Sequence, residues 1–285
     1  MLKEISHLQS RIKTLPETPG VYLMYADDSE CHPLYIGKSN SIKKRIYSHC
    51  QEAKKNPSKL RLLSRTNAIE YFDTAGDLGA LLLESKLIKA LKPLYNKRLR
   101  RCRSVFHYEI SESSRTYLTL KKSTIDNFTA AENCYGLFET QKAANSCLRD
   151  LCKTNQLCFK RCGLEKGTGP CFQFHLKKCL GCCCEKEPYD SHDERLKEAL
   201  RHLQQVAWPF TGAIKIVEKN NINKSEDIHI FNQWRHLRSD YACNATNNIS
   251  PLQNHSKIEF DRDQYHILRG ILTRDYPDNI KVSSI

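Results

Sequence analysis

Two short apolar runs near the start of the chain predict an antiparallel β-hairpin. The first covers residues 21–26 (VYLMYA), and the second covers residues 34–37 (LYIG) and ends at a glycine. The polar stretch 27–30 (DDSE) between them is typical of a turn. Tyr22 and Tyr35 lie on neighbouring strands of this hairpin, so their hydroxyl groups can converge if both side chains project from the same face.

The elements that follow complete a small unit of strands and helices. A helix is predicted near residues 41–54, a third strand over residues 68–73, and a second helix that ends near Leu91. The run 74–77 (TAGD) resembles a capping box for that second helix. This order of elements predicts an α/β (α+β) domain over residues 1–103, with a small antiparallel three-stranded sheet and flanking helices.

The rest of the chain is predicted to form three further segments. We expect connecting strands and a helix over residues 104–157, a Cys-rich metal-binding segment over residues 158–190, and a smaller α+β C-terminal domain over residues 191–285. The run 260–268 (FDRDQYHIL) carries two aspartates and a histidine, but its pattern is typical of the exposed face of a helix rather than of a second acidic site. No role for the C-terminal domain follows from its sequence.

The positive charge of the chain is concentrated in its first third. The formal net charge is +13, from 45 Lys and Arg against 32 Asp and Glu. Residues 1–101 hold 19 basic and 10 acidic side chains, a balance of +9, whereas the remainder holds 26 and 22, a balance of +4. A basic N-terminal domain favours a polyanionic partner such as nucleic acid, although a generally basic protein is the simpler alternative.

The sequence shows no pattern of an exported or membrane-spanning protein. Its first residues (MLKEIS) form no apolar signal segment, and its most apolar run, residues 78–83 (LGALLL), is far shorter than the roughly 18 residues of a membrane helix. We therefore expect a cytoplasmic protein. In a reducing compartment the 14 cysteines are expected to be metal ligands or free thiols rather than disulfides.

A single carboxylate lies within the apolar stripe of the second predicted helix. At helical spacing the neighbours of Glu84 are all aliphatic: Leu81, Leu87, Ile88 and Leu91. A buried carboxylate is costly unless something pairs with it. Glu84 is therefore a candidate ligand for Mg²⁺ or Mn²⁺, because such a cation needs few carboxylates and keeps several waters. The alternative is a glutamate at the edge of the stripe that reaches water or a lysine.

Further candidate residues follow the tyrosines in a fixed order. Lys38 trails the second strand, Arg45 lies on the next helix, Glu84 stands in LLLESKLIK and Asn96 stands in PLYN. Each string is short, but the ordered set over residues 16–101 resembles the GIY-YIG endonuclease domain. The resemblance implies a nuclease that hydrolyses a phosphodiester with one divalent cation, a reaction in which positioning and electrostatic stabilisation do most of the work.

The resemblance also implies roles for the central residues of this set. Glu84 would hold the single metal ion. Tyr22 would help to take the proton from the attacking water. Arg45 would bind the scissile phosphate and stabilise the charge that develops on it.

Four supporting residues complete the catalytic set. Tyr35 and Lys38 would support the network around the water and the phosphate, and Asn96 would brace the site by hydrogen bonding. His49 stands four residues after Arg45, where many relatives have a tyrosine. It would serve as a proton shuttle or simply fill the helix surface.

A second candidate site is the group of nine cysteines between Cys147 and Cys184. Four of them have the spacing C-x12-C-x7-C-x3-C: Cys158, Cys171, Cys179 and Cys183. Cys182 and Cys184 are close alternatives, and Cys162 could replace the first cysteine of the set. Four thiolates without a histidine suit zinc or an iron–sulfur cluster, and the alternative is a loop of free thiols.

This cysteine segment also resembles the one in the bacterial excinuclease subunit UvrC. The likeness is carried by residues 169–184 (GPCFQFHLKKCLGCCC), and the runs YGLFETQKAANSCLRDLC, LCFKRCGLEKGTGPC and WPFTGAIKIVE extend it over most of the chain. It implies a [4Fe–4S] cluster. We prefer this cluster to zinc because zinc knuckles usually show two C-x-x-C pairs, and here only Cys179 and Cys182 have that spacing.

The UvrC likeness implies a role in nucleotide excision repair. The chain is too short for the second nuclease domain and the helix-hairpin-helix tail of UvrC, which indicates a short homologue with one nuclease site. Such a homologue would make one incision in damaged double-stranded DNA, 3′ to a lesion that UvrB marks after loading by UvrA, and would leave 3′-hydroxyl and 5′-phosphate ends. Two alternatives remain: a stand-alone GIY-YIG nuclease of the structure-specific or homing kind, and a non-catalytic nucleic-acid-binding protein with a structural metal knot.

Overall fold

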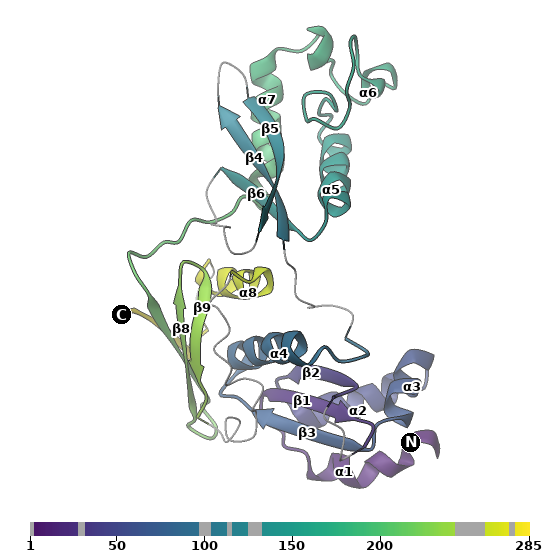
Figure 1. Ribbon diagram of the computed structural model, residues 1–285, viewed down its shortest axis with the longest axis vertical. Coiled ribbons are helices and arrows are strands. Elements are labelled where there is room, and N and C mark those ends of the chain that lie inside the picture. Colours follow the sequence, from purple (N-terminus) through teal and green to yellow (C-terminus); the bar gives the residue numbers. More distant parts are fainter. Residues whose placement is uncertain are drawn as a thin grey trace. The chain divides into compact units, whose positions relative to one another are not determined.

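The computed structural model describes residues 3–27, 32–96, 104–112, 116–124, 133–242, 260–273 and 277–285. The chain divides into two units (Figure 1). The first unit combines residues 1–101 with residues 210–285, and the second unit comprises residues 102–209. Among the described helices, none is both long enough and apolar enough to cross a membrane.

The predicted three-stranded antiparallel sheet forms the centre of the nuclease-like part of the first unit. Its strands are β1 (Gly20–Tyr25), β2 (Tyr35–Ser39) and β3 (Ala68–Asp73), in the order β2-β1-β3. β1 pairs with both neighbours and is buried along its whole length, as a central strand covered on both faces must be. The fold-class prediction is confirmed.

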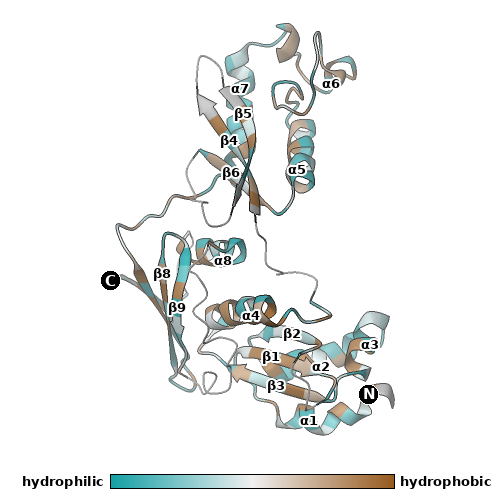
Figure 2. Cartoon of the chain, viewed as in Figure 1, coloured by the Kyte–Doolittle hydropathy of each residue, from teal (hydrophilic) through white to brown (hydrophobic). Residues whose placement is uncertain are grey.

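Helices cover both faces of this sheet. Tyr22 and Met24 of β1 pack toward η1 (Lys3–Leu8), α1 (Gln9–Thr14), α2 (Ile42–Glu52) and α3 (Pro57–Ser64). The alternate residues Val21 and Leu23 pack toward α4 (Asp77–Leu91) on the opposite face. Figure 2 shows that β1 and much of α4 are hydrophobic. The sheet is therefore the middle of three layers.

The register of β1 and β2 places the two tyrosines on one face of the sheet. Tyr22 lies opposite Gly37, and Met24 lies opposite Tyr35. Since side chains alternate along a strand, Tyr22 and Tyr35 project to the same side, with ring centroids 6.1 Å apart. A Cβ atom on Gly37 would lie 2.4 Å from Tyr22 Oη, so only glycine lets this ring lie across β2.

The C-terminal part of the first unit is a second antiparallel sheet with one helix. Its four strands have the order β10-β7-β8-β9. Their bounds are Ile214–Lys219 for β7, Glu226–Asn232 for β8, Arg235–Asp240 for β9 and Ile280–Ser284 for β10, and the helix is α8 (Arg262–Leu272). In β7 the buried residues are Ile214, Ile216 and Glu218, so a carboxylate occupies a core position of this strand.

The second unit packs a three-stranded sheet against two helices. The sheet has the order β5-β4-β6, with β4 (Ser104–Glu112), β5 (Thr116–Thr124) and β6 (Cys134–Phe138). The helical elements are α5 (Gln141–Thr154), α6 (Phe172–His175), η3 (Cys182–Cys184), α7 (Tyr189–Leu200) and η4 (Arg201–Leu203).

The boundaries of these units differ from the divisions expected at residues 157/158 and 190/191. Both divisions fall inside the second unit. Leu196 and Leu200 of α7 share one hydrophobic core with Leu148 of α5 and Tyr108 of β4, so α7 does not begin a separate domain. The residues after 209 instead join the N-terminal unit, which an analysis by sequence order could not reveal.

Candidate active site

The hydroxyl of Tyr22 and the imidazole of His49 form the buried centre of the site. Tyr22 Oη lies 2.6 Å from His49 Nε2, and neither side chain is accessible to solvent. The rings of Tyr22 and Tyr35 both meet the His49 ring edge-on, with centroids 5.9 Å away. His49 is therefore buried and does not fill the helix surface, and the proton shuttle stays a prediction.

Lys59 of α3 fixes the orientation of the His49 ring. Its Nζ atom lies 2.8 Å from His49 Nδ1 and 5.3 Å from the centroid of the Tyr35 ring. An ammonium group only donates hydrogen bonds, so His49 Nδ1 is the acceptor. The neutral ring then carries its proton on Nε2 and donates it to the oxygen of Tyr22.

Arg45 lies one helical turn before His49 on the same face of α2. Its Nη1 atom is 3.5 Å from Glu52 Oε1, and Ser48 Oγ donates to the same oxygen at 3.1 Å. Burial raises the pKa of Tyr22 well above its ordinary value, with the neighbouring Tyr35 adding to the shift and the Arg45 guanidinium opposing it. The guanidinium is thus close enough to favour negative charge on the Tyr22 oxygen.

Glu84 of α4 meets the end of β2. Its Oε1 atom accepts the backbone N–H of Lys38 at 3.0 Å. The Lys38 side chain pairs instead with Asp77, the first residue of α4, with Nζ 2.5 Å from Oδ1. Burial raises the pKa of Glu84, while the backbone hydrogen bond and the charges of Lys38 and Arg45 oppose the shift. Burial raises the pKa of Tyr35, the charge of Glu84 adds to this shift and the charge of Arg45 opposes it. The three side chains therefore lie close enough to interact electrostatically.

Asn96 ties the end of this fold to β2. Its Oδ1 atom accepts the backbone N–H of Ile36 at 2.8 Å, and its Nδ2 atom donates to the carbonyl of Ile36 at 2.8 Å. The side-chain amide thus imitates a neighbouring strand. Ile36 lies between Tyr35 and Gly37, so the amide holds the segment that carries the second motif.

The structure brings together every residue that the sequence proposed for this site. Tyr22, Tyr35, Arg45 and His49 gather on the face of the hairpin that α2 and α3 cover, and the charge of Glu84 acts on both tyrosines from α4. Lys38 donates its backbone N–H to Glu84 and pairs its side chain with Asp77, and Asn96 binds the backbone of β2 at Ile36. Among the described residues, no Lys or Arg forms an ion pair with Glu84, and one such carboxylate with open coordination suits a hydrated divalent cation.

The sequence interpretation missed Lys59 and Glu52. Asn56 followed by Pro57 is a typical helix start, and Asn56 does cap α3 through the N–H groups of Ser58 and Lys59. That signal would have placed a lysine on the first turn of a helix near the tyrosines. Glu52 lies three residues after His49, on the same face of α2, and its Oε2 atom is 3.8 Å from His49 Nδ1.

The buried, neutral imidazole predicts how stability depends on pH. Burial, together with the charges of Lys59 and Arg45, lowers the pKa of His49 from 6.5 to about 3. Between these values only the unfolded chain binds a proton here, so this contribution to folding stability is complete above about pH 6.5 and is lost as the pH falls toward 3. His49→Gln should therefore weaken the pH dependence. Urea unfolding midpoints from about pH 7 to about pH 4 test this, and equal slopes for the two proteins would contradict it.

The second candidate site lies in the second unit, where four thiols converge. Cys171 Sγ lies 3.8 Å from Cys158 Sγ and 3.5 Å from Cys179 Sγ. The sulfur of Cys183 lies within 4.8 Å of those of Cys158 and Cys171. Backbone N–H groups of Cys171 and Gly181 donate to the sulfurs of Cys183 and Cys179 at 3.2 and 3.3 Å. The four sulfurs are those with the predicted spacing, and their donor set fits a thiolate-bound metal centre.

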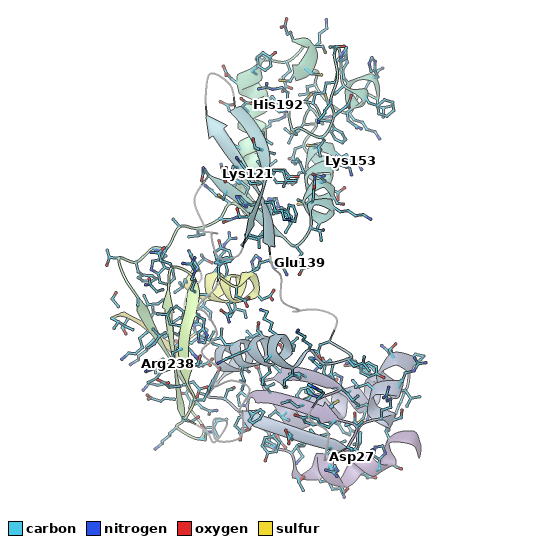
Figure 3. All side chains as sticks on the ribbon, in the orientation of Figure 1. Asp27, Lys121, Glu139, Lys153, His192 and Arg238 are labelled. Carbon is cyan, nitrogen blue, oxygen red and sulfur yellow. The ribbon has the colours of Figure 1, made fainter. Side chains whose placement is uncertain are left out.

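Cys162 and Cys184 occupy other positions, whereas Cys182 is buried in the same cluster as Cys158, Cys171 and Cys179 and stays an alternative ligand. Cys162 packs beside Cys152 in the hydrophobic core and also meets His192. Cys184 donates its thiol proton to the carbonyl of Gly181 at 3.2 Å. His192 (labelled in Figure 3) accepts the backbone N–H of Cys158 at 3.1 Å and so holds the first cysteine of the set in place.

Comparisons with known proteins divide the chain into three consecutive domains. A model of the UvrC-like GIY-YIG domain matches residues 18–97, one of the UvrC/Cho excinuclease middle domain matches residues 105–202, and one of the excinuclease Cho C-terminal domain matches residues 213–283. Fold and site together therefore define a GIY-YIG endonuclease of the UvrC type.

The similarity to individual proteins is more specific. Excinuclease cho of Escherichia coli strain K12 is 36% identical over 274 residues, which cover 95% of this chain and 88% of that protein. The chain belongs to the excinuclease Cho family. UvrABC system protein C of Clostridioides difficile is 28% identical over 208 residues, 69% of this chain and 33% of that protein. The magnesium-bound GIY-YIG N-terminal endonuclease domain of UvrC from Thermotoga maritima is 28% identical and covers 34% of this chain and 99% of that chain, with a TM-score of 0.28.

Proposed function

We propose that this endonuclease makes a single incision in damaged double-stranded DNA, on the 3′ side of a lesion, in a complex with UvrB that UvrA has loaded. The observation that carries the proposal is the gathering of Tyr22, His49, Arg45 and Glu84 around one hairpin. The surrounding residues 1–101 have a net charge of +9, which suits the DNA backbone. A protein with this charge and no damage-reading motif would depend on another protein to mark the lesion.

Glu84 would hold a single Mg²⁺ or Mn²⁺ ion. When bound, such an ion polarises the scissile phosphate and acidifies a coordinated water. The chain itself orients the Glu84 carboxylate. The N–H of Lys38 donates to Oε1 at 3.0 Å, and the backbone of Glu84 is held in helix α4. The raised pKa of the buried carboxyl supports a site built to receive positive charge, because a nearby cation would favour the ionised form.

Tyr22 would help to remove the proton from the attacking water. Burial keeps its hydroxyl neutral at rest. His49 donates its Nε2 proton to the Tyr22 oxygen, and Lys59 holds the imidazole in that tautomer. For this step the phenolic proton of Tyr22 would first leave to solvent water, because His49 Nε2 already carries a proton. The phenolate that remains would accept the proton of the attacking water, and the Nε2–H donor already in place lowers the cost of its negative charge.

The remaining residues would bind and position. Arg45, with 41% of its side chain exposed, can reach a phosphate and stabilise its developing charge. Tyr35 would support the water and phosphate network beside it. Lys38 would act through its backbone N–H and through Asp77, and Asn96 would brace β2.

We also propose that residues 158–190 bind a [4Fe–4S] cluster through Cys158, Cys171, Cys179 and Cys183. The short sulfur–sulfur distances and the N–H donors that face the sulfurs support a metal centre at this place. Zinc remains the alternative, because four thiolates also suit that ion.

An incision assay tests the proposed function. A lesion-bearing duplex, labelled at either end, is expected to be nicked once, 3′ to the lesion, only when UvrA, UvrB and Mg²⁺ are all present. EDTA should stop the reaction, and an undamaged duplex of the same sequence serves as the control. The products should carry 3′-hydroxyl and 5′-phosphate ends.

Other outcomes point to the alternatives. Efficient cutting of the undamaged duplex without UvrB would identify a stand-alone GIY-YIG nuclease. Salt-sensitive DNA binding with no cutting under any of these conditions would identify a non-catalytic nucleic-acid-binding protein.

A further inference from the structure

Helix α4, which carries Glu84, has no capping side chain of its own. Its N-cap residue is Gly76, and no side chain near it in the sequence accepts the free N–H groups of the first turn. The capping box expected over residues 74–77 is wrong, because Thr74 Oγ1 donates to the carbonyl of Gly76 instead of accepting from the helix. The first amides of this helix therefore need partners from elsewhere.

Glu218 of β7 supplies these partners from 140 residues away in the sequence. Its Oε1 atom accepts the N–H of Leu78 at 3.0 Å, and its Oε2 atom accepts the N–H of Gly79 at 2.8 Å. The side chain is only 1% exposed. A carboxylate at a helix N-terminus is favoured by the helix dipole, so both the hydrogen bonds and the charge suit this position.

Asp227 of β8 holds the residue that precedes the helix. Its Oδ2 atom accepts the N–H of Ala75 at 2.8 Å, and its Oδ1 atom accepts the N–H of Ala242 at 3.1 Å. The Asp227 side chain is completely buried. The Asp227 carboxylate thus joins the residue that precedes the N-cap of α4 to the segment that follows β9.

Two glycines allow these carboxylates to approach. A Cβ atom on Gly76 would lie 2.3 Å from Glu218 Oε1, and one on Gly79 would lie 2.6 Å from Asp227 Oδ2. A Cβ atom at either position would force the carboxylate to shift from its hydrogen bonds. Glycine is common at an N-cap such as Gly76, but Gly79 in the first turn weakens the helix by itself, so its absent side chain makes sense as room for Asp227.

The far end of α4 is held by ionic contacts. Lys89 Nζ lies 2.5 Å from Asp261 and 3.0 Å from Asp263, which stand at the N-terminus of α8. Asp261 caps α8, and both aspartates pair with Lys89 of α4. Figure 1 shows α8 and the C-terminal sheet beside α4 in this unit.

The charges show why the two parts depend on one another. Burial raises the pKa of Glu218 and of Asp227, and the backbone hydrogen bonds oppose the shifts. Within the described residues, neither carboxylate pairs with a Lys or Arg, so the amides at the start of α4 are their main stabilising partners. If α4 moved away from β7 and β8, Glu218, Asp227 and the amides at the start of α4 would lose these hydrogen bonds. Any of these groups that stayed buried would then be unpaired, which is costly.

We propose that Glu218 and Asp227 are positioning residues of the nuclease, through which the C-terminal residues 210–285 fix α4 and thereby set Glu84 against β2. This proposal rests on the proposed role of Glu84 as the metal ligand. Glu84 lies seven residues beyond Asp77, about two helical turns, so a tilt or shift of the first turn moves the carboxylate with it. Asp77 would move as well, together with its contact to Lys38.

Two measurements on the full-length protein test this role. Hydrogen exchange without metal or DNA reports the protection of the Leu78 and Gly79 amides. Nicking rates over a Mg²⁺ series give the concentration for half-maximal activity. In Glu218→Ala we expect exchange of both amides to accelerate at least about tenfold and the Mg²⁺ requirement to rise about 10- to 100-fold. Glu218→Gln keeps one acceptor oxygen and should show a smaller change in both.

Matched controls separate positioning from a general loss of stability. Lys219→Ala, next to Glu218 on β7, removes an exposed ion pair with Glu226 of β8, and Ile216→Val shortens a buried side chain of β7. Both should keep the wild-type Mg²⁺ requirement. Circular dichroism identifies the temperature range in which every variant is folded, and Glu218→Gln serves if Glu218→Ala does not fold.

The possible results are distinct. An unchanged Mg²⁺ requirement in a folded Glu218 variant overturns the positioning role, and unchanged exchange at Leu78 and Gly79 overturns the capping contact itself. Wild-type cutting that needs no Mg²⁺ would instead remove the proposed function of Glu84. The exchange data would still decide whether Glu218 holds α4.

Discussion

Replacing Glu84 by alanine is expected to reduce DNA nicking by at least about a thousandfold while DNA binding persists. Glu84 is the carboxylate that α4 presents to the site, and the Lys38 N–H already holds one of its oxygens at 3.0 Å. Without it the backbone of β2 remains, but no anionic side chain of α4 other than Asp77 is available to hold a cation, and Asp77 is engaged by Lys38.

The measurement compares single-turnover nicking with equilibrium binding to the same duplex. Arg45→Ala should lower the rate by about 100- to 1000-fold, because the guanidinium would stabilise charge that appears only in the transition state. Glu70→Gln, at an exposed position of β3, is the matched control and should cut like the wild type. Persistent cutting by purified Glu84→Ala protein would remove the proposed mechanism.

Substituting Cys171 by alanine is expected to abolish metal binding at the proposed centre of the second unit. Cys171 lies at the centre of the four sulfurs, 3.8 Å from Cys158 Sγ and 3.5 Å from Cys179 Sγ. A missing ligand leaves the remaining thiols without a complete coordination sphere. Structural metal sites contribute on the order of 10 kcal/mol to the folding of small domains, so the second unit should also unfold far more readily.

Absorption spectra and metal analysis of anaerobically purified protein provide the measurement. Wild type should show the broad visible absorption of an iron–sulfur cluster, and Cys171→Ala should lack it. Cys184→Ala is the matched control, because that thiol bonds to the carbonyl of Gly181 instead of joining the group. Loss of the chromophore in Cys184→Ala would show that the ligand set is wrong, and stoichiometric zinc without visible absorption would identify a zinc site.

The elements that were predictable from the sequence are those with strong local signals. Strand β3 is found over the residues expected for it, since AIEYFD is bounded by polar residues and rich in β-forming side chains. The ordered motif named Tyr22, Tyr35, Arg45 and His49, which the structure brings together on one face of the hairpin. Helix α3 was not predicted, although Asn56 followed by Pro57 is a typical helix start.

The contacts that could not be predicted join distant parts of the chain. The sequence left Cys162 as a replacement for Cys158, and only the packing of Cys162 beside Cys152 in the core distinguishes the two. The alternation of β7 places Glu218 on the buried face of the strand, but the sequence does not indicate that it pairs with the N–H groups of Leu78 and Gly79. Such pairings depend on three-dimensional proximity, which hydrophobic periodicity does not encode.

The split first unit has a consequence for how this fold can be reused. A GIY-YIG domain is often pictured as a self-contained module that can be joined to different neighbours. Here the start of its metal-bearing helix is completed by acceptors that the chain supplies more than a hundred residues later. A fusion protein that carried residues 1–101 alone would therefore have the motif, but the first amides of α4 would lack the acceptors Glu218 and Asp227. A functional fusion would need residues 210–285 as well.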